Sequence, residues 1–170
     1  ELVKVSDELL ELTPKSRNAD KIRFQGAVAR SELGNHDAAA TVFATLIETS
    51  KNASLVHQAM FRLAWSKQLT GKLASAAAMY DKVAKTSKGF YSENAYYNLA
   101  VVCFLQKQYA KAIEELLGFS KAYPKSNLGQ RVRLYLGRSY LETKDYKRAV
   151  TCLKQLSVKS DIKAPATLWL

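Results

Sequence analysis

Residues 96–124, with the sequence YYNLAVVCFLQKQYAKAIEELLGFSKAYP, decide the fold of this chain. Apolar residues recur at helical spacing in both halves of the stretch: Tyr96, Leu99, Ala100 and Cys103, then Ala112, Leu116 and Phe119. A polar break at residues 106–108 separates the two runs, and Pro124 closes the segment. This pattern predicts two amphipathic helices joined by a tight turn. One such hairpin cannot bury its own apolar face, so it needs copies of itself.

The copies recur at a regular period along the chain. A small residue opens each second helix, and the intervals between these residues are 37, 36 and 37 positions: Ala39, Ala76, Ala112 and Ala149. The seventh and eighth places of the copies are Gly26-Ala27, Leu63-Ala64, Leu99-Ala100 and Leu136-Gly137. Large apolar residues follow each opening alanine at four and seven places: Phe43 and Leu46, Tyr80 and Val83, Leu116 and Phe119, Leu153 and Leu156. Small residues let two helices approach closely, and large ones fill the space beside them. The sequence therefore predicts an all-α stack of repeated helical hairpins.

This pattern resembles the tetratricopeptide repeat family over almost the whole chain. In the fourth copy the matching residues are Leu136-Gly137, Tyr140, Asp145-Tyr146 and Ala149, which stand where the family has Leu-Gly, Tyr, Asp-Tyr and Ala. Arg133 departs from the usual aromatic residue, and the period exceeds the family's usual length of about 34. Ser50-Lys51 and Ser87-Lys88 replace the closing proline. The resemblance implies a solenoid with a right-handed superhelical twist.

The longer period also resembles the repeats of a group of bacterial cell-envelope proteins. The segment Tyr123-Pro124-Lys125-Ser126, followed by residues 136–140, is similar to the periplasmic coordinator associated with the Tol-Pal system and to the outer-membrane assembly lipoprotein. This resemblance implies a place in the bacterial periplasm or cell envelope, with the cytoplasm as the alternative.

We expect one repeat domain over residues 1–170, as a piece of a longer array. It divides into a half-repeat at 1–19, four repeats at 20–56, 57–92, 93–129 and 130–163, and a half-repeat at 164–170. The expected helices span about 20–33, 37–50, 55–69, 73–87, 92–106, 109–123, 128–143 and 146–158. Residues 9–14 match a helix end with a closing proline, and residues 164–170 match the start of a fresh helix. We expect the chain to self-associate through these incomplete ends.

Nothing in the sequence indicates catalysis, a metal or a cofactor. His36 and His57 are isolated, and Cys103 and Cys152 have no Cys or His at metal-ligand spacing. The chain contains no Gly-rich phosphate loop and no nucleophile elbow. No apolar run approaches the 18 residues that indicate a membrane span. We therefore expect a noncatalytic protein.

The resemblance implies where a partner would bind. In the family the first helix of each repeat lines the concave surface through its second, fifth, ninth and twelfth places. Among these places we select as partner-binding candidates Phe24, Phe61, Trp65, Asn94, Tyr97, Val101, Phe104, Arg131, Leu134 and Arg138. Five of them are aromatic, and exposed aromatic patches commonly mark partner sites. Two alternatives stay open: an additional helix covers this surface, or neighbouring repeats pack against it.

The family members that clamp a peptide's terminal carboxylate use Lys, Asn and Arg side chains on three successive first helices. Asn98 and Arg131 fit two of those places. Phe61, Trp65 and Tyr135 occupy others. The sequence therefore argues against a carboxylate clamp.

Charge is distributed unevenly along the chain. The formal net charge is +11, and residues 121–163 contain eleven Lys or Arg against three Asp or Glu. Such a field favours an acidic partner. The leading interpretation is a scaffold that binds a protein or peptide through an aromatic groove. The alternative is a polyanion-binding module, for nucleic acid or an anionic envelope polymer, that uses the basic C-terminal half; nucleic acid is disfavoured because the basic residues are scattered around the helices.

Overall fold

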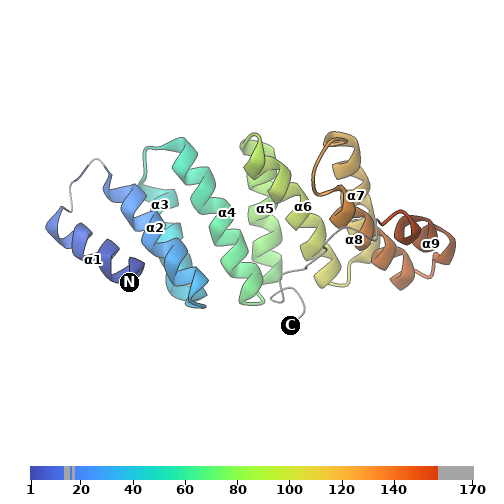
Figure 1. Ribbon diagram of the computed structural model, residues 1–170, viewed down its shortest axis with the longest axis horizontal. Helices are drawn as coiled ribbons and strands as arrows, with labels where there is room; N and C mark the ends of the chain where they lie inside the picture. Colours follow the sequence, from blue (N-terminus) through green and yellow to red (C-terminus); the bar gives the residue numbers. More distant parts are fainter. Residues whose placement is uncertain (14–15, 17, 157–170) are drawn as a thin grey trace. The chain divides into compact units, whose positions relative to one another are not determined.

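The computed structural model describes residues 1–13, 16 and 18–156. Within these ranges the regular structure is entirely α-helical, as Figure 1 shows. The helices are α1 (Leu2–Leu12), α2 (Ala19–Glu32), α3 (His36–Thr49), α4 (Ala53–Leu69), α5 (Leu73–Thr86), α6 (Phe90–Leu105), α7 (Tyr109–Ala122), α8 (Gly129–Glu142) and α9 (Tyr146–Lys154). The all-α hairpin architecture predicted from the sequence is confirmed.

The ends of the helices agree with the sequence prediction to within two residues, with one exception. α9 ends at Lys154, four residues before the expected end. The closing proline at residue 14 and the fresh helix expected at 164–170 lie outside the described residues. The self-association expected through those ends therefore stays a prediction.

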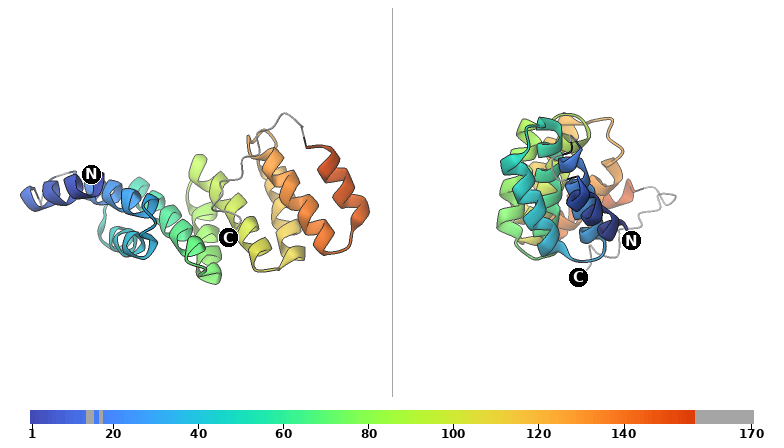
Figure 2. Two further views of the ribbon diagram at one scale, coloured as in Figure 1. Left: turned by 60° about the horizontal axis from the view of Figure 1, so that its bottom comes forward. Right: turned by 90° about the vertical axis from the view of Figure 1, so that its left-hand side faces the viewer.

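The chain divides into two compact units, with the boundary inside α6 between Leu99 and Ala100. In the first unit, consecutive helices pack side by side from α1 to α5, and α2 also contacts α4. In the second unit, α7 packs on α8 and α8 packs on α9, as the left view of Figure 2 shows for the latter pair. Each unit thus consists of helical hairpins stacked on their neighbours.

The residues of the repeat skeleton form the core of both units. All four opening alanines are completely buried: Ala39, Ala76, Ala112 and Ala149. The large side chains that follow them in the first three copies are buried as well: Phe43, Leu46, Tyr80, Val83, Leu116 and Phe119. In the fourth copy, a Cβ added at Gly137 would come 2.6 Å from Leu153 Cδ2, so the Leu153 side chain of α9 occupies the space beside Gly137 and would have to shift. The predicted roles of small and large residues are confirmed in the first three copies, while in the fourth the large residues Leu153 and Leu156 are half-buried.

One turn motif closes the first helix of all four repeats. Its central residue adopts a left-handed conformation with φ between 60° and 85°: Gly34, Gly71, Lys107 and Lys144. The amide of the next residue donates to a carbonyl five residues earlier, over 2.8–3.0 Å, as from Asn35 to Arg30 and from Asp145 to Tyr140. This is the Schellman arrangement, which satisfies the last carbonyls of a helix. The turn sets the antiparallel geometry of each hairpin.

Candidate partner-binding surfaces

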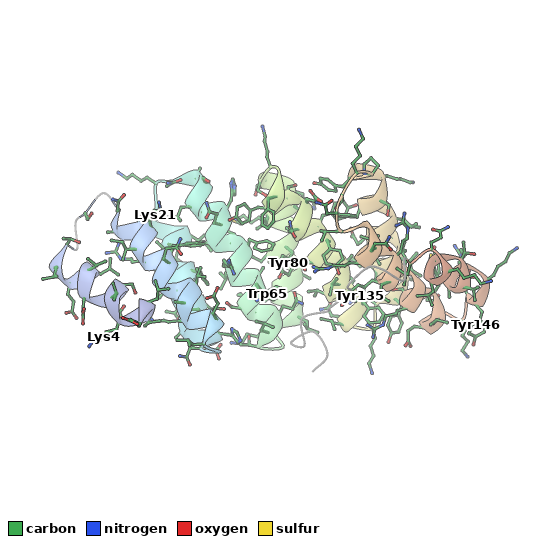
Figure 3. The ribbon with its side chains drawn as sticks, in the orientation of Figure 1. Lys4, Lys21, Trp65, Tyr80, Tyr135 and Tyr146 are labelled. Atoms are coloured by element: carbon green, nitrogen blue, oxygen red, sulfur yellow. The ribbon has the colours of Figure 1, made fainter. Side chains whose placement is uncertain are left out.

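In the first unit, two aromatic side chains of α4 that were predicted to bind a partner are half-buried. Phe61 and Trp65 are four residues apart, so they share one helix face. The Phe61 ring makes edge contacts with Tyr80 and Tyr91, at centroid distances of 5.8 and 5.6 Å. Figure 3 marks Trp65 on α4 and Tyr80 on α5. These contacts hold Phe61 in place while part of its surface stays accessible.

Three candidates are buried, so the expectation that they lie open is wrong. Phe24 packs on Phe43 with ring centroids 5.6 Å apart, inside a cluster that α2, α3 and α4 form together. Tyr97 and Val101 belong to α6, where every residue from 97 to 103 is buried. This stretch of α6 therefore offers a partner no accessible side chain. Asn94 is half-buried, and its Nδ2 donates to the carbonyl of Phe90 over 2.8 Å.

A groove of about 460 Å³ lies between α2 and α4, beside the loop that leads into α4. Its lining includes Lys21, Phe24 and Gln58, three inner-face positions of the repeat pattern that the structure brings together. Lys51 and Asn52 contribute from the loop, and Asn52 Oδ1 caps α4 by accepting from the Leu55 amide.

An apolar groove of about 340 Å³ lies between α1 and α2. Leu2, Val5 and Leu9 line it from α1, and Ile22 lines it from α2. The three α1 side chains are exposed. The sequence predicted a half-repeat at residues 1–19 but did not identify this surface.

In the second unit, Phe104 is the centre of an aromatic and cationic cluster. Its ring makes edge contacts with Tyr109 and Tyr135, at centroid distances of 5.4 and 5.3 Å. The Arg138 guanidinium carbon lies 4.8 Å from the Phe104 centroid and 5.8 Å from that of Tyr135. These are distances at which a cation is attracted to the face of an aromatic ring. The structure therefore joins two predicted residues, Phe104 and Arg138, in one surface.

The remaining candidates of this unit lie on the same face of α8. Arg131 is exposed, Leu134 and Arg138 are half-buried, and Leu141 is 43% exposed. Their spacings of three, four and three residues place them in one stripe along the helix. The packed side of the helix is buried through Val132, Leu136, Ser139 and Tyr140, and Tyr135 is buried next to the stripe. We call the exposed set, Arg131, Leu134, Arg138 and Leu141, the α8 stripe.

Electrostatics around the α8 stripe are predominantly basic. Desolvation, followed by the charge and the hydrogen bond of Glu142, raises the pKa of the Tyr109 hydroxyl. Burial raises the pKa of Tyr135, while the charges of Arg138 and Arg131 oppose that rise. Residues 100–156 contain eleven Lys or Arg against four Asp or Glu. An anionic group would therefore meet a favourable field here.

Sequence reasoning did not select Tyr109, Tyr91 or Tyr135 for this role. Tyr109 precedes Ala112 by three places, as Tyr146 precedes Ala149, so the repeat alignment contained a signal for it. Tyr146 is nevertheless 61% exposed, while Tyr109 contacts Phe104. The fourth repeat has Leu141 in the place of Phe104, which explains why only Tyr109 joins an aromatic cluster.

The described residues contain no group of three or more His, Cys, Asp or Glu that could hold a metal ion. Cys103 is buried and Cys152 is half-buried, and neither forms a disulfide. Burial raises the pKa of both thiols, which disfavours the reactive thiolate. Among the described helices, none is both long and apolar enough to cross a bilayer.

Two family models match the chain. The model described as "Anaphase-promoting complex, cyclosome, subunit 3" matches residues 70–156, and a tetratricopeptide repeat model matches residues 24–89. Because the first match covers just over half of the chain, the chain belongs to that family, a family of tetratricopeptide repeats. The complex in that name belongs to the protein after which the model is named, and the match does not assign this chain to it. No curated protein matches the chain significantly in sequence.

Solved structures of the same architecture confirm the solenoid fold. MamA from residue 41 to its end, from Desulfovibrio magneticus RS-1, is 19% identical, with a TM-score of 0.74 over 91% of this chain and 83% of that one. BtubC from P. vanneervenii is 17% identical, with a TM-score of 0.77 over 90% of this chain and 69% of that one. At these identities the likeness concerns the fold alone. The similarity to Tol-Pal and outer-membrane lipoprotein repeats rests on the sequence resemblance only.

Proposed function

We propose that this chain is a noncatalytic scaffold that binds a protein or peptide partner through the inner faces of its first helices. Tetratricopeptide-like folds generally mediate protein–protein interaction, which supports the class of function. The Phe104 cluster beside the α8 stripe is the observation that supports this choice of binding surface. There, an aromatic ring, a stacked arginine and partly exposed leucines share one face. Aromatic residues and arginine are enriched among the residues that dominate interfaces.

Phe61 and Trp65 provide the corresponding surface in the first unit. Both are partly exposed, and Phe61 is held by two neighbouring rings. A preorganised aromatic anchor loses little conformational entropy when it binds. We place the scaffold in the bacterial cell envelope, a setting that rests on the resemblance of residues 123–140.

The test uses a partner isolated with the chain as bait and then purified. The double substitution Phe61→Ala with Trp65→Ala should weaken binding by on the order of 2 kcal/mol or more, because truncated aromatic anchors leave a cavity in the interface. Tyr146→Ala is the matched control, since Tyr146 is an aromatic residue that is 61% exposed outside the selected positions. Isothermal titration calorimetry measures both. Equal affinities of the parent and the double variant would exclude α4 as a binding face.

A second candidate function, polyanion binding, is favoured by the excess of basic residues in residues 100–156. Duplex DNA or heparin would then bind with an affinity that falls linearly in log salt, with a slope of about −0.9 per neutralised DNA phosphate. Such binding should depend on Arg131, Arg138, Lys147 and Arg148 and be indifferent to Phe61 and Trp65. A steep salt dependence together with that pattern would favour the polyanion over the protein partner.

A further inference from the structure

We propose that the α8 stripe binds an acidic amphipathic helix of the partner, with two carboxylates seven residues apart and an apolar side chain between them. This inference rests on the proposed function and specifies the class of partner. It concerns the second unit alone.

The spacing of the stripe is the first argument. Arg131 and Arg138 are seven residues apart on one helix face, which separates them by about 10.5 Å along the axis. Leu134 lies between them and Leu141 lies beyond, so charged and apolar groups alternate. A partner helix repeats the same three-and-four spacing on its own face, whereas an extended strand alternates with a period of two. A helix therefore matches every member of the stripe in one register.

The position of Arg138 is the second argument. Its guanidinium lies over the Phe104 ring and near the Tyr135 ring, and Phe104 is in turn held by Tyr109. A guanidinium stacked on aromatic rings is already ordered, so it loses less conformational freedom when it binds a carboxylate. Arg138 is thus positioned for recognition of a carboxylate beside an apolar group.

Charge is the third argument. Arg131 is exposed and forms no ion pair with any described residue. Glu142, the one acidic residue of α8, is the last residue of the helix and follows Leu141 at the end of the stripe. Arg133, the third arginine of α8, belongs to a separate groove beside Tyr123 and Pro124. The stripe therefore presents two cations separated by a leucine. This arrangement suits a peptide better than the continuous backbone charge of a nucleic acid.

The experiment uses the full chain and three designed helical peptides of equal length. The matched peptide has Glu residues seven apart with Leu between and beyond them, the shifted peptide has the same residues with the Glu five apart, and the third has Lys in place of Glu. We expect the matched peptide to bind about two- to fivefold more tightly than the shifted one, because only it reaches both arginines with one face. Fluorescence anisotropy at physiological salt measures the three affinities. Equal binding of the matched and shifted peptides would overturn the proposal.

Charge exchange provides the specific control. The variant Arg131→Glu with Arg138→Glu should lose the matched peptide and gain the Lys peptide. Arg133→Glu with Lys147→Glu changes the net charge equally and should change neither affinity. Arg131→Glu alone removes no contact with the aromatic rings, so this single variant still tests the charge requirement if the double variant misfolds. Circular dichroism shows whether each variant is folded. An equal loss of affinity for the matched peptide in both double variants would indicate nonspecific charge attraction and would overturn the proposal. Duplex DNA that competes with the matched peptide as well as unlabelled matched peptide does would overturn it in the same way.

The purified natural partner separates this inference from the proposed function. A partner whose binding requires Phe61 and Trp65 but tolerates Arg131→Glu with Arg138→Glu would overturn the inference and support the scaffold. A partner that tolerates both sets of substitutions would overturn both. A further test changes the two carboxylates of the partner to Lys. If this changed partner no longer binds the parent chain but binds the charge-reversed variant, both the inference and the proposed function are supported.

Discussion

Helices α4 and α8 occupy the same place in two copies of the repeat, yet they differ in the chemistry of one face. At the four inner positions α4 has Gln58, Phe61, Trp65 and Gln68, and α8 has Arg131, Leu134, Arg138 and Leu141. On the packed face the two helices are alike, with Leu63-Ala64 in one and Leu136-Gly137 in the other, all buried. The packed face is constrained by the approach of neighbouring helices, while the inner face can change its chemistry without changing the fold.

The two units also differ in their turns. The left-handed position is glycine in both turns of the first unit, Gly34 and Gly71, and lysine in both turns of the second, Lys107 and Lys144. The hydrogen bonds of the turn are the same in all four. The shared geometry therefore comes from the helix end and not from one residue type.

The largest expected effect tests whether the skeleton is truly common to the copies. Ala112→Leu or Ala149→Leu should each destabilise the fold by about 1–3 kcal/mol, because both alanines are completely buried and a larger side chain overpacks the contact. Ala110→Leu is the matched control, since Ala110 is exposed on the same helix as Ala112. Urea unfolding followed by circular dichroism gives the free energies. Unchanged stability of both core variants would contradict the shared register.

A smaller effect distinguishes the turns of the two units. Gly71→Ala should cost about 1 kcal/mol, because an L-residue is strained at a φ of 73°. Lys107→Gly should have the opposite sign, with a gain of about 0.5 kcal/mol, since the relief of strain exceeds the entropy that glycine adds to the unfolded chain. Thermal unfolding of the parent and the two variants measures these changes in stability. A loss of stability in both variants would show that Lys107 contributes a contact that outweighs its strain.

The smallest effect concerns the two side-chain helix caps. Asn52 caps α4 in the first unit, and the carboxylate of Asp145 caps α9 in the second by accepting from the Arg148 amide over 3.0 Å. The amide and side chain of Arg148 hold the pKa of Asp145 below its usual value. A lowered pKa gives stabilisation that is present above the unfolded pKa of about 3.9 and is lost as pH falls through the folded value.

Asp145→Asn should therefore flatten the loss of stability below about pH 4, while Asn52→Ser should leave the pH dependence as it is in the parent. Urea midpoints measured across the acidic range test this difference. Identical pH profiles for the parent and Asp145→Asn would show that the cap does not contribute to acid unfolding.

The sequence by itself determined the repeat period, the helices and the buried skeleton. Helix periodicity and the recurrence of Ala39, Ala76, Ala112 and Ala149 are local signals, and close helix packing requires small residues wherever it recurs. The basic character of the second unit was also visible in the composition.

Only the tertiary structure decided which inner positions are accessible. Phe24 and Phe61 hold the same place in the repeat, but Phe24 is buried against Phe43 while Phe61 remains partly exposed. Likewise, Phe104 and Arg138 are 34 residues apart in the chain, and only the packing within the second unit places the guanidinium over the ring. Exposure and stacking depend on the side chains of neighbouring helices, which a periodic pattern within one helix does not specify.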